Sequence, residues 1–381
     1  MTEPQQNNPA VVDPTVIDPN ALVQIRRVRK SFGAHQVLRD ISLSVPAGTV
    51  TVLLGPSGSG KTTLLSMIAG LAVPDEGQLL INGQDVTYGA PYERDIGMVF
   101  QNYALFPHMT IAENIAFPLK MRKQGRAAAM QRAQQALELV HLPHVAQRFP
   151  KELSGGQQQR IALARCLVYQ PSIVLMDEPL GALDKKLREH MQLEIKRIHR
   201  ESGTTIVYVT HDQEEAMTMS DRICLMNGGR IEQLGTPGEL YFRPRTPFVA
   251  DFLGESNLLK GTVVQAAGGQ AEIALAGTGT AIHASAHQPL SAGSAVQVMV
   301  RPQNITVGGA QGNAQQSFTG RVMDTMITGG LTKLYLSSAQ LGNGPVVLSF
   351  PTSASTQGFG IGAAVSFGWS SADAVAVPEQ S

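Results

Sequence analysis

The sequence predicts an α/β domain with a helical insertion, followed by a small all-β domain. The chain has 381 residues, more than one hydrophobic core usually supports. Between about residues 22 and 254, strand-like and helix-like segments alternate, which is typical of a largely parallel sheet with helices on both faces. The last 127 residues carry only 4 Lys+Arg and 5 Asp+Glu, against 26 and 25 in the first 254, so the composition changes near Gly254.

The first domain consists of strands, a helix and an insertion in a recognisable order. Residues 61–71 place Leu64 and Ile68 at helical spacing and predict a helix. Between about residues 101 and 153 the strand signal fades, and an Ala-, Gln- and Arg-rich stretch over 126–142 predicts a helical insertion. The predicted buried strands are the apolar runs 48–54, 172–176 and 204–209.

The two ends of the chain differ from this central part. Short alternating segments separated by Gly-Gly, Gly-Asn and Pro predict an OB-like β-barrel domain over residues 255–381. Residues 1–21 carry regularly spaced prolines between polar residues and no basic start, so we expect a disordered extension and not a secretory signal. The clearest strand candidates of the tail are residues 296–300, 334–336 and 346–350.

Composition excludes several classes of protein. The 30 Lys+Arg balance 30 Asp+Glu, and a formal net charge of zero argues against a generic nucleic-acid binder. No stretch approaches the roughly 20 apolar residues that span a bilayer, so we expect no membrane span. Cys166 and Cys224 form neither a disulfide framework nor a metal cluster, and buried thiols in a reducing compartment are the simplest interpretation.

Residues 55–62 form a glycine-rich segment between a predicted strand and a predicted helix. Their sequence, Gly-Pro-Ser-Gly-Ser-Gly-Lys-Thr, matches the phosphate-loop pattern G-x-x-x-x-G-K-[ST]. Small residues let backbone N–H groups turn toward phosphate oxygens, and the helix start adds a positive dipole. In such a loop Lys61 reaches the β- and γ-phosphates and Thr62 binds Mg²⁺. The alternative is a chance glycine-rich turn, which the flanking strand and helix disfavour.

An acidic pair, Asp177 and Glu178, directly follows the apolar residues 173–176. A buried strand there would deliver Asp177 at its carboxyl end, the edge where ligands bind in doubly wound sheets. Glu178 points differently because strand side chains alternate, and it is placed to orient or deprotonate a water. Alone, such a pair is common; the phosphate loop gives it meaning.

Ser154, Gly155, Gly156 and Gln157 precede a second helix with apolar residues at helical spacing. A serine followed by two glycines predicts a capped helix start that can bind another anion. One chain with two such starts, only one of which carries a lysine, makes sense if the second serves a nucleotide held by another copy. The pattern therefore predicts a head-to-tail pair closed by two-fold symmetry.

The combination of GPSGSGKTT, LSGGQQQR and LMDEP, over about residues 23–254, resembles the ATP-binding cassette (ABC) ATPases, which have a P-loop NTPase fold. The resemblance implies ATP and Mg²⁺ as cofactors. It implies that Phe32 stacks on adenine, although a lone Phe is more often a core aromatic. It also implies that His211 contacts the γ-phosphate, although a lone His after a strand is more often structural.

The resemblance implies three groups of site residues. The catalytic group is Glu178, His211, Gln101 and Lys61, and the Mg²⁺ ligands are Thr62, Gln101 and Asp177. The nucleotide-binding group is Phe32, Gly55, Pro56, Ser57, Gly58, Ser59, Gly60, Lys61, Thr62 and Thr63 of one copy, with Ser154, Gly155, Gly156, Gln157 and Asp184 at the interface between two copies.

Two segments of the tail, residues 248–258 and 298–307, resemble the TOBE-like β-domain of bacterial import ATPases, with Gln303 where that group usually has Glu. Residues 102–110 and 111–118 are typical of the polyamine and iron end of the group. The resemblance therefore implies an ATPase that powers import of the polyamine (spermidine/putrescine) type. Ferric iron, phosphonate, sulfate and sugar import are the alternatives.

The resemblance also implies partners that supply the membrane path. Such importers combine a homodimer of ATPase subunits with two permease subunits and a periplasmic binding protein, at the cytoplasmic face of the inner membrane and without nucleic acid. Phe100, Tyr103 and Phe106 would either line the permease groove or pack in the core. Three alternatives stay open: a soluble ATPase acting on nucleic acid or ribosomes, a β tail that regulates the ATPase without coupling to import, and an exporter.

Overall fold

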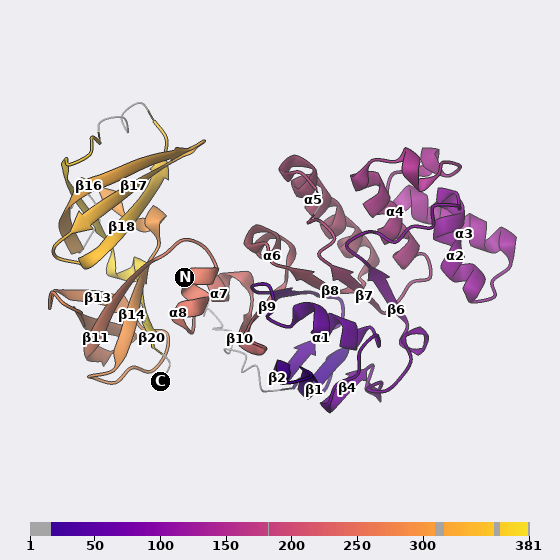
Figure 1. Ribbon diagram of the computed structural model, residues 1–381, viewed down its shortest axis with the longest axis horizontal. Helices are drawn as coiled ribbons and strands as arrows, with labels where there is room; N and C mark the ends of the chain where they lie inside the picture. Colours follow the sequence, from indigo (N-terminus) through magenta and orange to yellow (C-terminus); the bar gives the residue numbers. More distant parts are fainter. Residues whose placement is uncertain (1–16, 182, 309–315, 354–358, 380–381) are drawn as a thin grey trace, which may run out of the picture. The chain divides into compact units, whose positions relative to one another are not determined.

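The computed structural model describes residues 17–181, 183–308, 316–353 and 359–379, and the chain divides into two compact units between Pro237 and Gly238 (Figure 1). The predicted disordered extension, residues 1–21, lies mostly outside the described residues. Its last residues contact the first strands, because Gln24 Nε2 donates to the Pro19 carbonyl at 2.9 Å. Among the described helices, none has the length and apolar character that a membrane crossing requires.

A six-stranded sheet forms the centre of the first unit. All neighbouring strands are parallel except β10 (Arg230–Gly235), which is antiparallel to β9 (Arg222–Asn227). The three predicted strands are present and are the most deeply buried ones. Because β3, β6, β7 and β8 are parallel, their carboxyl ends meet at one edge of the sheet. The strand order is β10 (Arg230–Gly235), β9 (Arg222–Asn227), β3 (Val50–Leu54), β8 (Thr205–Thr210), β7 (Ile173–Asp177) and β6 (Ile96–Val99).

A second sheet of the first unit is antiparallel, which the alternation of strands and helices did not predict. It shares one hydrophobic core with the parallel sheet and with helix α1 (Lys61–Ile68); Ile25, Leu43 and Leu64 are completely buried there. Its other face carries exposed polar side chains, so its strands lack the continuous apolar runs of the parallel sheet. The strand order is β2 (His35–Val45), β1 (Val23–Phe32), β4 (Glu76–Ile81) and β5 (Gln84–Asp85).

The predicted helical insertion lies between β6 and β7 (Figure 1). It holds α2 (Ile111–Met121) and α3 (Arg126–Leu139), which pack against each other and against α4 (Gly155–Leu167). The buried side chain of Asn114 fixes the loop before α2, because it accepts from the Phe106 amide at 2.8 Å and donates to the Phe106 carbonyl at 3.0 Å. The helices are therefore joined to the loop that follows β6.

The second unit contains more β-structure than the single barrel that the sequence predicts. A closed five-stranded barrel and a further five-stranded sheet share one core, in which Phe318, Phe367 and Trp369 are buried. The barrel is closed by the last strand of the chain, β20, which pairs with β13 and β14. The barrel order is β11 (Asn257–Ala267), β12 (Gln270–Leu275), β13 (Ala281–Ser285), β20 (Ala374–Pro378), β14 (Ala295–Val300); the sheet order is β15 (Thr306–Val307), β19 (Ala364–Trp369), β16 (Gln316–Thr328), β17 (Leu331–Ser338), β18 (Gly342–Pro351).

The buried side chain of Arg301 ties two short helices to the second unit. Its Nη1 donates to the carbonyls of Ala250 at 3.0 Å and Gly254 at 2.9 Å, and its guanidinium lies 4.2 Å from the centre of the Tyr241 ring. The second unit consequently begins ahead of the composition change near Gly254. The two helices are α7 (Pro237–Phe242) and α8 (Pro247–Phe252).

Candidate nucleotide-binding and catalytic site

The phosphate loop joins β3 to α1, as the sequence predicts. Two of its glycines are required by close approach. A Cβ on Gly55 (φ +151°) would lie 2.1 Å from the Met226 carbonyl oxygen, and one on Gly60 (φ +97°) would lie 2.5 Å from Leu38 Cδ2. The first N–H groups of α1 have no intrahelical partner, so this helix start can bind an anion. The other predicted positions in the segment are Pro56, Ser57, Gly58, Ser59, Thr62 and Thr63.

Lys61 provides the positive charge of this loop. It is only 5% exposed, and its Nζ donates to the carbonyls of Gly55 at 2.8 Å and Pro56 at 2.9 Å. Burial lowers the pKa of Lys61, while the nearby carboxylates of Glu178 and Asp177 act in the opposite direction. The ammonium group is thus poorly solvated, which strengthens its attraction for a phosphate.

Asp177 ends β7 at the edge of the sheet that the phosphate loop occupies. Thr62 Oγ1 donates to Asp177 Oδ1 at 3.4 Å. Burial raises the pKa of Asp177, so a cation beside this carboxylate would be favourable. Gln101 follows the neighbouring parallel strand, since Val99 of β6 pairs with Met176 of β7. A carboxylate, a hydroxyl and an amide at one edge make a set of hard oxygen ligands.

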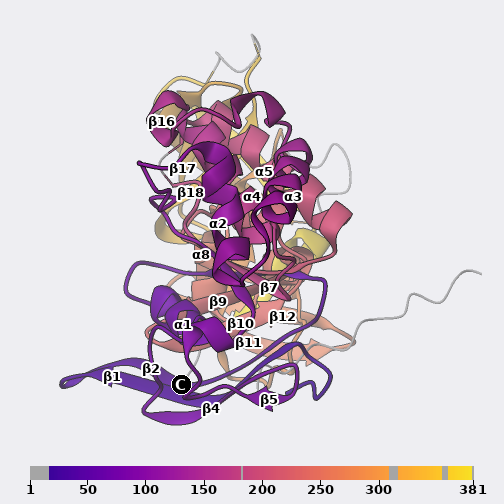
Figure 2. The same cartoon turned by 90° about the vertical axis from the view of Figure 1, so that its right-hand side faces the viewer.

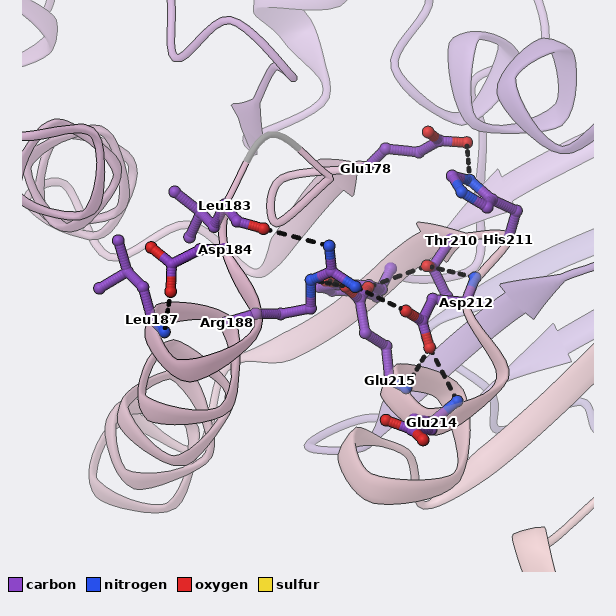
Figure 3. A network of polar contacts seen from close by, with 11 residues as sticks. Glu178, Leu183, Asp184, Leu187, Arg188, Thr210, His211, Asp212, Glu214 and Glu215 are labelled. Atoms are coloured by element: carbon purple, nitrogen blue, oxygen red, sulfur yellow. Dashed lines mark hydrogen bonds and ion pairs between the residues drawn. The ribbon is translucent and has the colours of Figure 1, made fainter. Parts of the chain in front are cut away.

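Glu178 and His211 are brought together at the same edge (Figure 3). Glu178 Oε1 lies 3.2 Å from His211 Nδ1, and the His211 side chain is 59% exposed. The Glu178 amide donates to the Val209 carbonyl at 3.0 Å, which fixes its backbone against β8. Its φ of +43° lies in the left-handed region, a strain that proteins retain chiefly at functional sites. The pair therefore projects from a rigid backbone toward solvent.

The second helix start, at α4, is capped but is not next to the phosphate loop. Ser154 Oγ accepts from the Gln157 amide at 3.4 Å, and Gln157 Oε1 accepts from the Ser154 amide at 3.0 Å. Gly155 is exposed, while a Cβ on Gly156 would lie 3.0 Å from Leu187 Cδ1. Figures 1 and 2 both show α4 well apart from α1. One chain alone does not unite its two anion-binding helix starts.

Phe32 is the last residue of β1 and its ring is 57% exposed. The alternative that Phe32 is a core aromatic is therefore wrong. Its strand pairs with β2, whose Leu38 approaches Gly60 of the phosphate loop. An exposed ring on a hairpin beside this loop is well placed for stacking on a base.

A polar network beside Glu178 and His211 contains residues that sequence reasoning missed. Asp184 Oδ1 accepts from the Leu187 amide at 3.0 Å and so caps α5 (Lys185–Ser202). Asp212 caps α6 (Gln213–Met219) in the same way. The spacing Asp212-x-x-Glu215 is a helix-start signal that could have indicated this cap. The missed members are Arg188, Tyr208, Asp212 and Glu215.

Phe100, Tyr103 and Phe106 differ in their surroundings. Phe100 is partly exposed and Tyr103 is buried, while Phe106 packs against Phe117 with 4.6 Å between ring centres. A neighbouring cleft of about 460 Å³ does not have these three among its lining residues. Its wall combines apolar and aromatic side chains, among them Tyr92, Met121 and Tyr169, with the charged side chains of Asp95, Arg122 and Arg165.

Comparison with known proteins agrees with this geometry. Residues 38–181 match the ABC transporter family and residues 298–377 match the TOBE domain. The spermidine/putrescine import ATP-binding protein PotA of Nitrosomonas eutropha is 46% identical over 82% of this chain and 86% of its own length. The Fe(3+) ions import ATP-binding protein FbpC of Rhizobium etli is 47% identical over 81% of this chain and 85% of its own length.

A solved structure of an ATP-binding cassette, dimeric and bound to ADP and phosphate after hydrolysis, is also similar. Its TM-score is 0.51 at 34% sequence identity, and the match covers 56% of this chain and 98% of that one. The similarity of the two import proteins extends over most of the length of both compared chains. The chain therefore belongs to the ABC transporter family, as an ATP-binding import subunit with a C-terminal TOBE domain.

Proposed function

We propose that this import ATPase hydrolyses ATP at an interface between two of its copies and powers the uptake of a polyamine. The observation that carries the proposal is the meeting of a phosphate loop, Asp177, Glu178 and His211 at one edge of one sheet. Lys61 and the N–H groups of the loop bind the β- and γ-phosphates. Glu178 orients the attacking water or takes its proton, and His211 contacts the γ-phosphate.

The residues at this edge fit a magnesium ion. Thr62, Asp177 and Gln101 offer the hydroxyl, carboxylate and amide oxygens that Mg²⁺ prefers, and the raised pKa of Asp177 favours a bound cation. The ion would supply positive charge to the phosphate oxygens. Orientation of the nucleotide and of the water comes from the chain itself.

The interface between two copies completes the site. The separation of α4 from α1 in one chain supports a nucleotide held by Lys61 of one copy and by Ser154, Gly155, Gly156 and Gln157 of the other. Asp184 and its loop would lie at the same interface, and Phe32 would stack on the adenine. The dimeric state of the similar solved cassette agrees with this arrangement.

The substitution Glu178→Gln tests the catalytic assignment. It keeps the size of the side chain and removes the base, so we expect kcat for ATP to fall roughly 100-fold or more while the Kd for ATP is unchanged. Glu138→Gln, at an exposed position of α3, is the matched control and should behave like wild type. Near-normal turnover of the Glu178 variant would contradict the proposal.

The cargo and the partners are the further part of the proposal. Residues 102–110 and 111–118, together with the relative named for spermidine/putrescine import, favour a polyamine; the relative named for Fe(3+) import makes ferric iron the second candidate. Two permease subunits would contact the cleft at Tyr92, Met121 and Tyr169, and the chain would then lie at the cytoplasmic face of the inner membrane.

Reconstitution separates the two candidate cargoes. The chain would be assembled with the permease that is recovered with it, and ATPase activity measured with a spermidine-loaded and with a ferric-iron-loaded binding protein. We expect stimulation by spermidine alone. Stimulation by ferric iron alone would replace polyamine by iron, and recovery of no permease with the chain would contradict the importer assignment.

A further inference from the structure

The side chain of Arg188, in the first turn of α5, joins two loops that lead to the Glu178–His211 pair (Figure 3). Its Nη2 donates to the Leu183 carbonyl at 3.1 Å, in the loop that continues from Glu178. Its Nη1 donates to Asp212 Oδ2 at 2.9 Å, in the residue after His211. One planar guanidinium thus spans the two segments that carry the pair.

The backbone on both sides of His211 is held by this network. Thr210 Oγ1 accepts from the Asp212 amide at 3.0 Å. Asp212 Oδ1 accepts from the amides of Glu214 at 2.8 Å and Glu215 at 3.1 Å, which caps α6. His211 therefore sits between two anchored residues, although its own ring is largely exposed.

The buried carboxylate of Glu215 is part of the same network. Glu215 is 2% exposed, and its Oε2 accepts from Tyr208 Oη at 2.9 Å and Thr210 Oγ1 at 2.8 Å. Its Oε1 lies 3.6 Å from Arg188 Nε, within range of an ion pair but beyond a hydrogen bond. Burial raises the pKa of Glu215, while the hydrogen bonds from Thr210 and Tyr208 and, to a smaller degree, the charge of Arg188 oppose that shift.

These contacts connect both segments that carry the pair. Arg188 joins Leu183 to Asp212, and His211, the residue before Asp212, lies 3.2 Å from Glu178. A displacement of Leu183 would shift the Arg188 side chain and, through it, Asp212, which directly follows His211 in the sequence. Asp184, which the proposed function places at the interface between two copies, directly follows Leu183.

We infer that Arg188 is a positioning residue that links the interface loop at Leu183 and Asp184 to His211, so that closure of two copies sets the Glu178–His211 geometry. The inference rests on the roles proposed above for Glu178 and His211. Arginine suits this task because its planar fork donates in two fixed directions, which a lysine ammonium does not.

The test compares Arg188→Met with the double variant Arg188→Met/Glu215→Gln in the full chain. The single variant leaves the Glu215 carboxylate buried without its cation, so it should melt earlier as well as turn over more slowly. The double variant removes that charge and keeps the contacts with Tyr208 and Thr210. We expect it to regain thermal stability while kcat stays roughly 10- to 100-fold low and the KM for ATP is unchanged.

Arg197→Met is the matched control, because Arg197 lies on the same helix with two carboxylates and one backbone carbonyl as partners. It should lower the melting temperature without lowering kcat. A double variant that regains kcat together with stability would overturn the inference and leave Arg188 a structural residue only. A wild-type chain without ATPase activity would instead overturn the proposed function.

Discussion

Two arginines, one in each compact unit, hold the backbone of a connecting segment in different ways. Arg301, in the second unit, is 2% exposed and donates to the carbonyls of Ala250 and Gly254 and to Ser256 Oγ at 2.6 Å. Arg188, in the first unit, has a side chain that is 28% exposed and pairs with the carboxylate of Asp212. The acceptors of Arg301 are all neutral, whereas Arg188 faces the carboxylates of Asp212 and Glu215 in addition to the Leu183 carbonyl.

This difference decides what each arginine can do. The neutral acceptors around Arg301 carry no charge that would offset the effect of burial, which lowers the pKa of Arg301. Its hydrogen bonds hold the backbone of the connecting segment at Ala250 and Gly254. The acceptors of Arg188 lie on loops that carry Glu178 and His211, so we propose that its contacts position these two side chains. Loss of Arg301 should therefore appear in stability alone, whereas loss of Arg188 should lower turnover as well as stability.

The largest effect on stability is expected for Arg301→Met. The substitution leaves several buried acceptors without a donor, so the second unit should lose roughly 3 kcal/mol of unfolding free energy. Calorimetry of the full chain should show a lower transition for one unit, because two compact units need not unfold together. The kcat for ATP of the remaining folded protein should equal that of wild type.

Arg321→Met provides the control, since this exposed arginine makes one long hydrogen bond to the Gly362 carbonyl at 3.3 Å. It should change stability by less than about 0.5 kcal/mol. If Arg301→Met lowered kcat at unchanged stability, the contrast between the two arginines would be lost.

The sequence predicted those parts of the fold and site that are continuous in the chain. The phosphate loop, the strand before Asp177 and the helix start at Ser154 are each encoded within a few residues, because a strand or helix boundary and its ligand-binding groups are local. The sheet of β15 to β19 and the antiparallel sheet were missed as separate layers. Their pairing joins distant segments, and short strands of many β-folds share the same alternation.

The network around Arg188 could not be predicted for a related reason. Its partner Asp212 lies on another strand–helix connection, and exposed ion pairs of the same residue types are common on helices. The same limit of sequence-based prediction applies to Phe100, Tyr103 and Phe106, for which a groove position and a core position both stayed open. Tyr103 is buried although Phe100, three residues earlier, is partly exposed, because a loop has no fixed period from which to predict its inner face.

Glu215→Gln tests whether the positive charge of Arg188 and its neighbours fully offsets the cost of burying the Glu215 carboxylate. Burial raises the folded-state pKa of Glu215 above its ordinary value of 4.5, so the folded chain binds this proton more tightly than the unfolded chain. Stability from this group is present below pH 4.5 and is lost as the pH rises through the folded-state pKa. Gln does not ionise, so the variant does not lose stability as the pH rises. It should therefore be more stable than wild type near neutral pH, by about 1 kcal/mol or less.

Urea unfolding at several pH values measures this difference, which should shrink toward zero as the pH falls to 4.5. A variant that is less stable than wild type at neutral pH would mean that Thr210, Tyr208 and Arg188 together overcompensate the buried carboxylate. Asp212→Asn would then be the informative companion, because it removes the other acid that faces the same guanidinium.

The smallest effect is expected at Gln303, two residues after Arg301, where the resemblance to import ATPases leads us to expect Glu. Gln303 Nε2 donates to Tyr241 Oη at 2.6 Å, and the Tyr241 ring packs against the Arg301 guanidinium. In Gln303→Glu the hydroxyl would donate to the carboxylate instead of accepting from the amide, so the contact survives with its direction reversed. We expect the unfolding free energy of the second unit to change by less than about 0.5 kcal/mol because the position is exposed.

Gln303→Leu, which removes the contact, should be the less stable of the two variants in urea unfolding. A loss in Gln303→Glu as large as that in Arg301→Met would show that the amide, and not the buried arginine, holds α7 in place.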